Sequence, residues 1–343
     1  MNIIYLLPSE KKPTGGIKVI LDHSQIINNT KNEFNSSIIF IKKKKTSKWK
    51  NSLNKLINFR NENYLGWRSN EIIADKNINN QWFDNKINIK KKLNFNNKND
   101  FVILPEIFAH FAKDLLIKKK INYAIFVQNG FAINFTSDDK ALDEVYKKAK
   151  FIISVSSHID KCIKKAFDLK QNKIIRINQS IISTKINYKS KLNLITYMPR
   201  KLPSHSSLVL FFLKKKLPKK WRILPLKDAT HKNIIKSLKK SKIFLSFSNL
   251  EGFGLPPIEA ASLGNLVVGY TGEGGKEYWK LPIFTKINQG DILNFVKKIE
   301  AKLINRIDNK QIENHRLRLL KKYSQINQVK KITKILNTLK RYY

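Results

Sequence analysis

The amino-acid sequence predicts an α/β protein with two domains, each built on a parallel β-sheet. Short apolar segments, typical of buried strands, alternate along the chain with amphipathic segments that are typical of helices. Such alternation is the pattern of parallel sheets covered by helices on both faces. The chain has 343 residues, long enough for two domains of ordinary size, and 42% of its residues are hydrophobic. This composition favours packed cores over disorder.

The first half of the chain predicts one sheet domain. Its strands are expected at residues 2–7, 37–41, 100–105, 123–127, 151–155 and 173–177, and its helices at 17–27, 106–116, 141–149 and 158–167. Residues 47–98 are rich in Asn and Lys, and their pattern predicts no element. The polar segment 185–191 lacks apolar periodicity, so we place the domain boundary there. The first domain then covers residues 1–188.

The second half predicts a second domain of the same kind, residues 189–323. Its strands are expected at residues 193–198, 221–226, 243–245, 266–270 and 283–287, and its helices at 204–216, 230–240, 257–263 and 291–304. Two basic amphipathic helices, residues 311–323 and 325–342, are expected at the end of the chain. The ordinary role of such helices is packing, with their lysines facing solvent.

Lysine dominates the charge of the protein, whose formal net charge is +42. Asparagine and isoleucine are also abundant, which is typical of coding bias toward A and T, so a lysine-rich solvated surface is one explanation. Attraction to anionic lipid headgroups is the other, and it predicts peripheral contact with an anionic membrane. Dedicated nucleic-acid binding is not expected, because arginines are few and the sequence matches no nucleic-acid module.

The sequence also bears on the cellular location. Its one cysteine, Cys162, excludes internal disulfides and a cysteine-built zinc site, and favours a reducing compartment. Residues 1–8 lack the basic start and the long apolar core of a signal peptide. No apolar run is long enough to span a bilayer. We therefore expect a cytoplasmic protein, with peripheral attachment at the inner face of the plasma membrane as a further expectation.

The most informative stretch is residues 246–264, S-F-S-N-L-E-G-F-G-L-P-P-I-E-A-A-S-L-G. It follows the apolar run 243–245 and contains a loop with Gly252 and Gly254, then a helix that begins near two prolines. Gly264 suits the position just past the helix end. A strand, a glycine loop and a helix aim backbone N–H groups and a positive helix end at one spot. The stretch therefore predicts an anion site.

Two carboxylates frame this loop. Glu251 opens it, and Glu259 lies within the helix that follows. A carboxylate is poorly placed beside a phosphate, but it accepts hydrogen bonds from hydroxyl groups. A ligand that carries both phosphates and hydroxyls fits both features, and a sugar nucleotide is such a ligand. The alternative, two solvated glutamates, is the ordinary interpretation of either Glu on its own.

Residues 251–259, E-G-F-G-L-P-P-I-E, closely resemble the signature of retaining, nucleotide-sugar-dependent glycosyltransferases of the GT-B fold, the large bacterial family 4 and its relatives. The resemblance is dense over residues 193–278 and thinner over 1–16 and 100–177. It implies the GT-B fold, with two Rossmann-like parallel-sheet domains facing a central cleft. It also implies a C-terminal helix, residues 324–343, that crosses back to the first domain.

The enzymes that this sequence resembles need no metal, because cationic side chains of the protein take its place. The sequence contains no Asp-x-Asp triad and no cluster of His with carboxylates at ligand spacing. We therefore expect neither a cofactor nor a metal, and a nucleoside diphosphate-sugar as the donor substrate.

The resemblance extends to individual residues. Arg200 and Lys201 follow the first strand of the second domain and would neutralise the leaving diphosphate. In the family the two cations are usually separated by several residues, so another nearby lysine is an alternative to Lys201. Glu251 would accept hydrogen bonds from the donor sugar, and Glu259 from the ribose. The other implied positions are His110, as a catalytic candidate near the sugar, and, for donor binding, Phe253, Gly254, Leu255, Gly15, Gly16, Gly274, Gly275 and Glu277.

For several positions a structural role is the alternative. Gly15 and Gly16 are also what a turn requires, and a lone His110 fits a satisfied structural histidine. Gln128 and Asn129 close a predicted strand at the edge where open parallel sheets bind ligands, but they fit a plain turn equally well.

The sequence therefore predicts a glycosyltransferase. It would move a sugar from a nucleoside diphosphate-sugar to a glycan or lipid-linked acceptor with retention, in the synthesis of cell-surface polysaccharide or lipopolysaccharide. One alternative is a catalytically inactive GT-B-like binding protein that uses its basic surface for anionic lipid or nucleic acid. A sugar-nucleotide epimerase is a further alternative, but such enzymes lack this loop signature.

Overall fold

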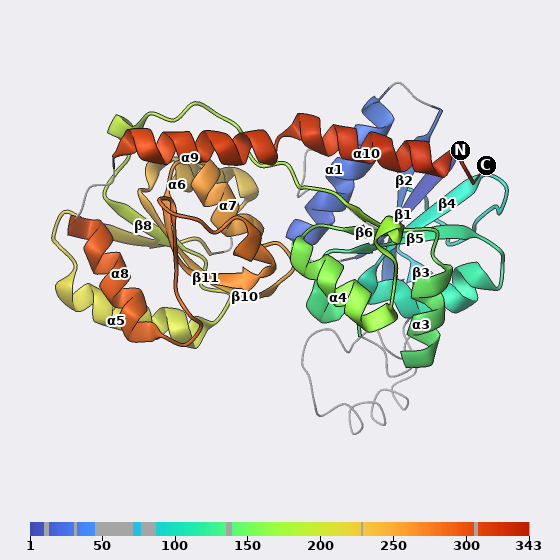
Figure 1. Ribbon diagram of the computed structural model, residues 1–343, viewed down its shortest axis with the longest axis horizontal. Helices are drawn as coiled ribbons and strands as arrows, with labels where there is room; N and C mark the ends of the chain where they lie inside the picture. The colour runs from blue at the N-terminus through green and yellow to red at the C-terminus, as the bar shows by residue number, and fades with distance from the viewer. Residues whose placement is uncertain are drawn as a thin grey trace. The chain divides into compact units, whose positions relative to one another are not determined.

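The computed structural model describes residues 1–9, 14–30, 33–44, 71–76, 87–134, 139–227, 229–304 and 308–342. The chain divides into two compact units, which Figure 1 shows. Unit 1 comprises Met1–Ile177 and Val329–Tyr343, and unit 2 comprises Asn178–Gln328. The sequence predicts these divisions at residues 188 and 323.

Sheet A of unit 1 has seven strands in the order β3-β2-β1-β4-β5-β6-β7. Neighbouring strands are parallel, except that β3 pairs antiparallel with β2. The strands are β1 (Asn2–Pro8), β2 (Asn35–Lys43), β3 (Ile72–Ala74), β4 (Asp100–Pro105), β5 (Asn122–Val127), β6 (Ile152–Ser154) and β7 (Ile174–Arg176). The prediction of a parallel sheet is correct except at this edge, where β3 lies in a region whose pattern predicted no element.

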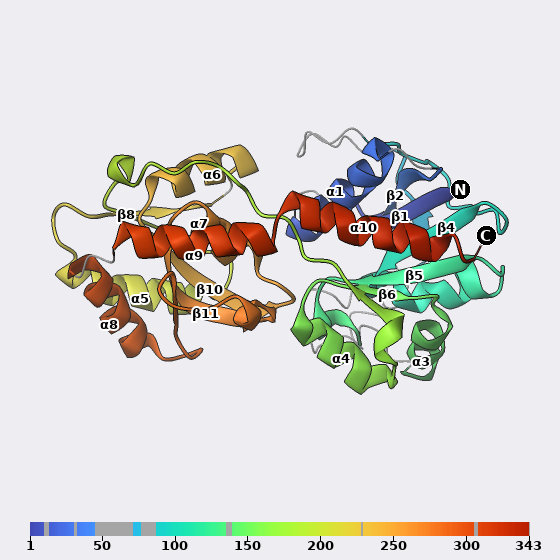
Figure 2. The same ribbon diagram turned by 45° about the horizontal axis from the view of Figure 1, so that its top comes forward.

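Helices cover both faces of sheet A. In Figures 1 and 2, α1 (Gly15–Asn29) lies on one side of the sheet, and α3 (Asp139–Lys148) and α4 (Ser157–Phe167) lie on the other. The helix expected at residues 106–116 is instead a 3₁₀ helix, Glu106–Phe111, followed by a π-helix, Lys113–Ile117. This winding keeps the side chains of Phe108, Ala112 and Leu116 fully buried.

Side-chain caps explain where several helices begin. The hydroxyl of Ser156 accepts the backbone N–H of Ile159 at the start of α4, at a distance of 3.3 Å. Thr230 caps α6 (His231–Lys240) in the same way. Each hydroxyl satisfies an N–H group that has no partner within its helix. The polar residue before each helical segment therefore sets its first residue.

Sheet B of unit 2 has five strands in the order β12-β11-β10-β8-β9, and all neighbouring pairs are parallel. The strands are β8 (Leu194–Tyr197), β9 (Arg222–Pro225), β10 (Ile243–Glu251), β11 (Leu266–Glu273) and β12 (Phe284–Lys286). The helices are α5 (Pro203–Lys216), α6, α7 (Leu255–Ser262), α8 (Ile292–Ile304), α9 (Asn309–Lys322) and the start of α10 (Gln325–Leu339). The predicted alternation is confirmed throughout this unit.

The central pair of sheet B is longer than the sequence predicts. The expected strand ended at residue 245, but β10 continues to Glu251 through a bulge between Ser248 and Glu251. A side chain at Gly269 of β11 would place its Cβ 2.1 Å from the carbonyl oxygen of Ser246, so glycine lets the two backbones approach closely. The extension carries Glu251 out to the end of the sheet.

The two C-terminal helices are amphipathic, as predicted. α9 buries Ile312 and Leu319, and α10 buries Ile332, Ile335 and Leu336. Their lysines largely face solvent. Of the helices within the described ranges, none combines the length and the apolar character that a membrane span needs.

A buried histidine makes the stability of unit 1 depend on pH. His23 of α1 is 0% exposed and stacks on Phe126 of β5, with the ring centroids 5.1 Å apart. Neither ring nitrogen has a hydrogen-bond partner among the described residues. Burial lowers the pKa of the imidazole from 6.5 to about 3. The unfolded chain therefore binds a proton at a pH where the folded chain does not, and stability falls as pH drops from 6.5 toward 3.

We expect His23→Leu to remove this pH dependence. Between pH 6 and pH 5, the free energy of unfolding of the variant relative to wild type should rise by about 1.2 kcal/mol. Urea unfolding curves recorded across this range measure the difference. The control Ile27→Val shortens a buried side chain of the same helix without changing a titratable group, so its effect should be the same at every pH. A pH-independent effect of His23→Leu would contradict the assignment.

Candidate active site

Predicted catalytic residues meet at the carboxyl edge of sheet B. Lys201 lies in the turn after β8, and Glu251 is the last residue of β10, the strand next to β8. Lys201 Nζ lies 2.7 Å from Glu251 Oε1, and the two side chains are 35% and 23% exposed. Because neighbouring parallel strands end at the same edge, segments far apart in the sequence deliver a cation and a carboxylate to one point.

Arg200 directly precedes Lys201 in this turn, but unlike Lys201 it is not paired with a carboxylate. Its side chain is exposed, and it makes no ion pair with any residue that the structure describes. Lys201, in contrast, is neutralised by Glu251. No described carboxylate neutralises Arg200, and its planar guanidinium suits two phosphate oxygens.

The turn before α7 offers few backbone donors, and they are well anchored. Gly254 is the N-cap, at φ +78°, and no side chain caps the helix. Pro256 and Pro257 have no N–H, so the free donors of the first turn are concentrated near Gly254 and Leu255. Phe253 is buried against Tyr278, whose hydroxyl donates to the carbonyl oxygen of Gly254 at 2.6 Å. The predicted anion-binding N–H groups therefore belong to a rigid turn.

Packing explains the glycines of the two loops. A Cβ at Gly274 would lie 1.9 Å from the carbonyl oxygen of Gly252, so the two backbones touch. Gly272 has φ +64°, and a Cβ there would lie 3.0 Å from Glu251 Cβ. Gly275 leaves room for the Tyr278 hydroxyl. These glycines let the end of β11 and the 3₁₀ turn after it pack against the end of β10 and the loop after it, whereas their contact with a donor remains a prediction.

The other predicted glutamates of unit 2 each face a partner. Glu259 of α7 accepts a hydrogen bond from His231 at the start of α6, with Nε2 and Oε1 3.3 Å apart. Glu277 accepts one from the Tyr323 hydroxyl at 3.1 Å. Nothing local in the sequence links His231 to Glu259, so the sequence does not predict this contact.

The remaining predicted residues belong to unit 1. Gly15 and Gly16 begin α1, and a Cβ at Gly16 would lie 2.8 Å from Oε1 of Gln128. The absence of a side chain at Gly16 thus makes room for Gln128. His110 lies in the 3₁₀ helix after β4, with its ring 3.9 Å from that of Phe111. A role of these three residues toward donor or acceptor stays a prediction.

Glu106 is a buried carboxylate for which the sequence predicts no role. It follows β4 and accepts the backbone N–H groups of Gln128 at 3.1 Å and Asn129 at 2.9 Å. Burial raises the pKa of its carboxyl to about 7, although both hydrogen bonds oppose that shift. Glu106 thereby ties the end of β4 to the loop after β5. An acidic residue directly after a buried strand was the available signal.

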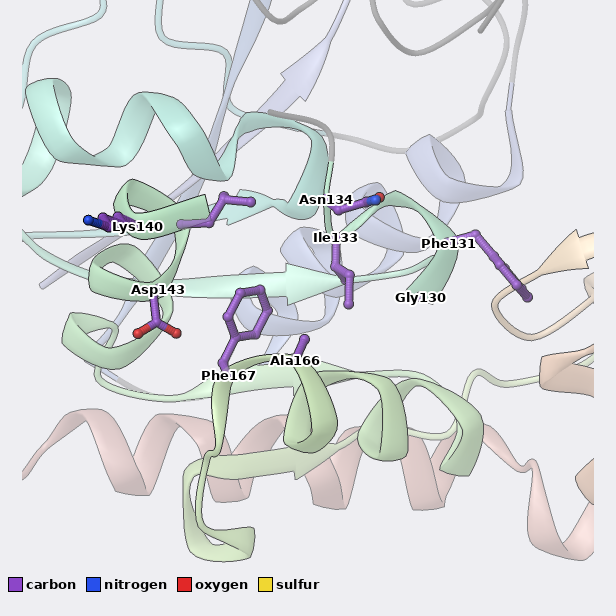
Figure 3. A pocket seen from close by; sticks show the side chains of 9 residues that line it. Gly130, Phe131, Ile133, Asn134, Lys140, Asp143, Ala166 and Phe167 are labelled. Atoms are coloured by element: carbon purple, nitrogen blue, oxygen red, sulfur yellow. The ribbon is translucent and has the colours of Figure 1, made fainter. Parts of the chain in front are cut away.

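A separate hollow of about 820 Å³ lies in unit 1, and Figure 3 shows it from close by. Ile133, which follows β5, and Phe167, at the end of α4, point toward one another across it. None of the predicted site residues lines this hollow. Within the described ranges, no group of three or more His, Cys, Asp or Glu side chains is arranged to hold a metal ion.

The two parallel-sheet α/β units define the class of fold. The chain has the GT-B fold, which its structural neighbours among the glycosyltransferases share. No protein-family model matches the sequence, and no curated protein matches it significantly. The class therefore rests on the three-dimensional comparison.

Three solved structures are similar over their full length. One is a variant of S. aureus TarM in complex with fondaparinux, α-GlcNAc-glycerol and UDP, with a TM-score of 0.66, 12% identity, and 98% of this chain and 99% of that chain covered. The lipopolysaccharide outer core galactosyltransferase WaaB has a TM-score of 0.64, 14% identity and 100% of both chains covered. Anabaena HepE in complex with UDP-glucose has a TM-score of 0.62, 12% identity, and 99% of this chain and 100% of that chain covered. Likeness at this identity shows the fold.

We expect Gly274→Ala to destabilise unit 2, because its methyl group would overlap the carbonyl oxygen of Gly252. Relieving the overlap requires a backbone shift that costs roughly 1–3 kcal/mol. Thermal unfolding of the variant measures the loss. Lys276→Ala, an exposed change in the same segment, is the control and should stay within about 0.5 kcal/mol of wild type. An equally small effect of Gly274→Ala would show that the loops are not packed as described.

Proposed function

We propose that the protein is a glycosyltransferase that moves a sugar from a nucleoside diphosphate-sugar to an acceptor. One observation carries the proposal: cations, free backbone N–H groups and carboxylates share the carboxyl edge of sheet B. Arg200 and Lys201 match a diphosphate, and Glu251 and Glu259 match hydroxyl groups. Because a fold hosts many functions, this arrangement of side chains supports the proposal more strongly than the fold does.

The proposed chemistry is stabilisation of the leaving diphosphate. Negative charge grows on the leaving group as the bond to the sugar breaks, and groups already aimed at that charge lower the barrier. Arg200 would bind two phosphate oxygens, and the N–H groups of Gly254 and Leu255 would bind others. The pair of Lys201 and Glu251 would open to the donor, with Nζ turning to the phosphate and the carboxylate accepting from sugar hydroxyls.

The proposed donor is a uridine diphosphate sugar. Support comes from the neighbours, since the TarM variant was solved with UDP and Anabaena HepE with UDP-glucose. We also propose retention of the anomeric configuration, which the resemblance of residues 251–259 implies. Since two protein cations lie where the diphosphate would bind, we propose that transfer needs no metal and no other cofactor.

The proposed acceptor is a glycan or a lipid-linked glycan, in the synthesis of cell-surface polysaccharide or lipopolysaccharide. Support comes from WaaB, a lipopolysaccharide outer core galactosyltransferase, and from the glycan fondaparinux bound to the TarM variant. The proposed site of action is the cytoplasm, with peripheral attachment to the inner face of the plasma membrane. The net charge of +42 supports attraction to an anionic surface.

The same charge favours a second candidate function. A protein with this net charge could use the fold as an inactive binding module for anionic lipid or nucleic acid. The two candidates differ in what they bind tightly at physiological salt. A transferase binds a nucleoside diphosphate through Arg200, whereas the binding module binds anionic vesicles or RNA and ignores the nucleotide.

We expect UDP to raise the thermal unfolding midpoint of the wild-type protein, because a ligand that binds only the folded state stabilises it. Arg200→Ala should weaken UDP binding by roughly 10- to 100-fold, since it removes a charge-assisted contact. Arg222→Ala removes another exposed arginine of unit 2 and should leave the shift unchanged. If UDP, ADP and GDP all fail to shift the midpoint while anionic vesicles bind tightly, the binding module is the better account.

We expect Glu251→Gln to reduce transfer on the order of 100-fold, because the neutral amide no longer offers an anionic acceptor to the donor sugar. Release of UDP from UDP-glucose in the presence of a lipopolysaccharide or glycan acceptor measures the rate, and EDTA in the assay should leave the wild-type rate unchanged. Glu300→Gln of α8 is the control and should retain full activity. Full activity of Glu251→Gln would contradict the proposed role of this carboxylate in donor binding.

A further inference from the structure

The contact between His231 and Glu259 lies at the same edge as the predicted donor site. His231 is the first residue of α6, and Glu259 lies in α7. Nε2 of the imidazole is 3.3 Å from Oε1 of the carboxylate. An ionised carboxylate has no proton to give, so the imidazole must donate in this contact. The side chains are 35% and 15% exposed, so a ligand can reach the pair.

Both partners are held by their own helices. The hydroxyl of Thr230 accepts the backbone N–H of Asn233 and fixes the first turn of α6, where His231 lies. The residues around Glu259, among them Ile258 and Ala260, are buried and anchor α7. His231 therefore presents a fixed donor to a carboxylate that would otherwise sample several rotamers.

Only one oxygen of Glu259 is used in this contact. Oε1 faces His231, whereas Oε2 has no partner among the residues that the structure describes. Glu259 lies four residues after Leu255, about one helical turn or roughly 6 Å along the axis from the N–H proposed for the diphosphate. A ribose follows its phosphates over a distance of this scale. The unused oxygen therefore suits the ribose hydroxyls.

We propose that His231 is a positioning residue that holds Glu259 for the two adjacent hydroxyls of a ribose, so that the protein selects ribonucleotides over 2′-deoxyribonucleotides. The inference rests on the proposed function, because it assumes that a nucleoside diphosphate binds at this edge. It adds His231 and a preference for ribonucleotides to that site. The proposed role concerns ligand binding alone, and no covalent bond is made or broken.

The physical basis is the cost of an unmatched acceptor. A carboxylate held in one orientation forms a hydrogen bond with each hydroxyl of the ribose. A 2′-deoxyribose leaves one of these unmade in a half-buried place, and a site built to bind a hydroxyl rejects the analogue that lacks it. When His231 is replaced by a residue without a donor, Glu259 gains freedom and the penalty for the deoxy ligand shrinks.

Two variants separate the hydrogen bond from other roles of the ring. His231→Phe keeps a flat ring of similar size and removes the donor. His231→Gln removes the ring and keeps an N–H near the position of Nε2. If His231 served only to pack α6 against α7, either change would weaken ribo and deoxyribo ligands alike and leave their ratio intact. The ratio of the ribo to the deoxyribo affinity therefore reports on the positioning of Glu259 rather than on the packing of the helices.

The experiment is calorimetric titration of UDP, ADP, GDP and CDP, each paired with its 2′-deoxy form, into wild type and the variants. For the base that wild type binds best, we expect the ribo form to bind about tenfold more tightly than the deoxy form. His231→Phe should lower this ratio to about two- or threefold by weakening the ribo form. His231→Gln should stay within about twofold of the wild-type ratio. Glu259→Gln, which removes the charged acceptor itself, should lose most of the selectivity.

The outcomes are distinct. An unchanged ratio in His231→Phe, or a wild-type protein that binds deoxyribonucleotides as well as ribonucleotides, overturns the role of His231 while leaving the proposed function in place. Failure of wild type to bind any nucleoside diphosphate overturns the proposed function and this inference with it. Thermal midpoints recorded without nucleotide confirm that each variant is folded. If His231→Phe does not fold, the ratios of His231→Gln and Glu259→Gln decide.

Discussion

The candidate site depends on one constraint, which is that neighbouring parallel strands end at the same edge of a sheet. In sheet B, β8 and β10 lie side by side, so the turn that carries Lys201 and the strand end that carries Glu251 meet. Helices that start at that edge bring Glu259 and His231 within contact of one another. No loop has to be long to achieve this. The chemistry of the site follows from strand order, which only the folded sheet defines.

A second constraint is how closely the loops of unit 2 approach. The loop after β11 lies on the loop after β10 with backbone against backbone, because Gly274 and Gly252 carry no side chains. Gly272 leaves space for the stem of Glu251, so the position of the carboxylate depends on a glycine of the neighbouring strand β11. Buried Phe253 and Tyr278 fill the space beneath. Glycines in a resembling motif can therefore reflect packing as well as ligand contact.

In unit 1, segments that follow neighbouring parallel strands also meet at one edge of the sheet. The carboxylate of Glu106 is buried after β4 and accepts two backbone N–H groups of the loop after β5, which fixes that loop. The side chain of Gln128, from the same loop, lies over Gly16 at the start of α1. Three segments that follow neighbouring strands are thus tied together at one edge. Gln128 and Asn129 form a turn at the carboxyl end of β5, and a contact of these residues with a ligand stays a prediction.

The sequence by itself determined the two-domain α/β architecture, because apolar periodicity and glycine or proline punctuation are local signals. It also singled out Glu251 and Glu259 through the resembling motif of residues 251–259, and Arg200 through the same family resemblance. The tertiary structure decided which side chains meet. The ion pair of Lys201 with Glu251 and the contact of His231 with Glu259 join segments that strand order alone brings together. The same holds for the antiparallel edge strand β3 and for the length of β10, which neighbouring strands impose. Local propensity cannot encode such pairs, because their partners are fixed only when the sheet forms.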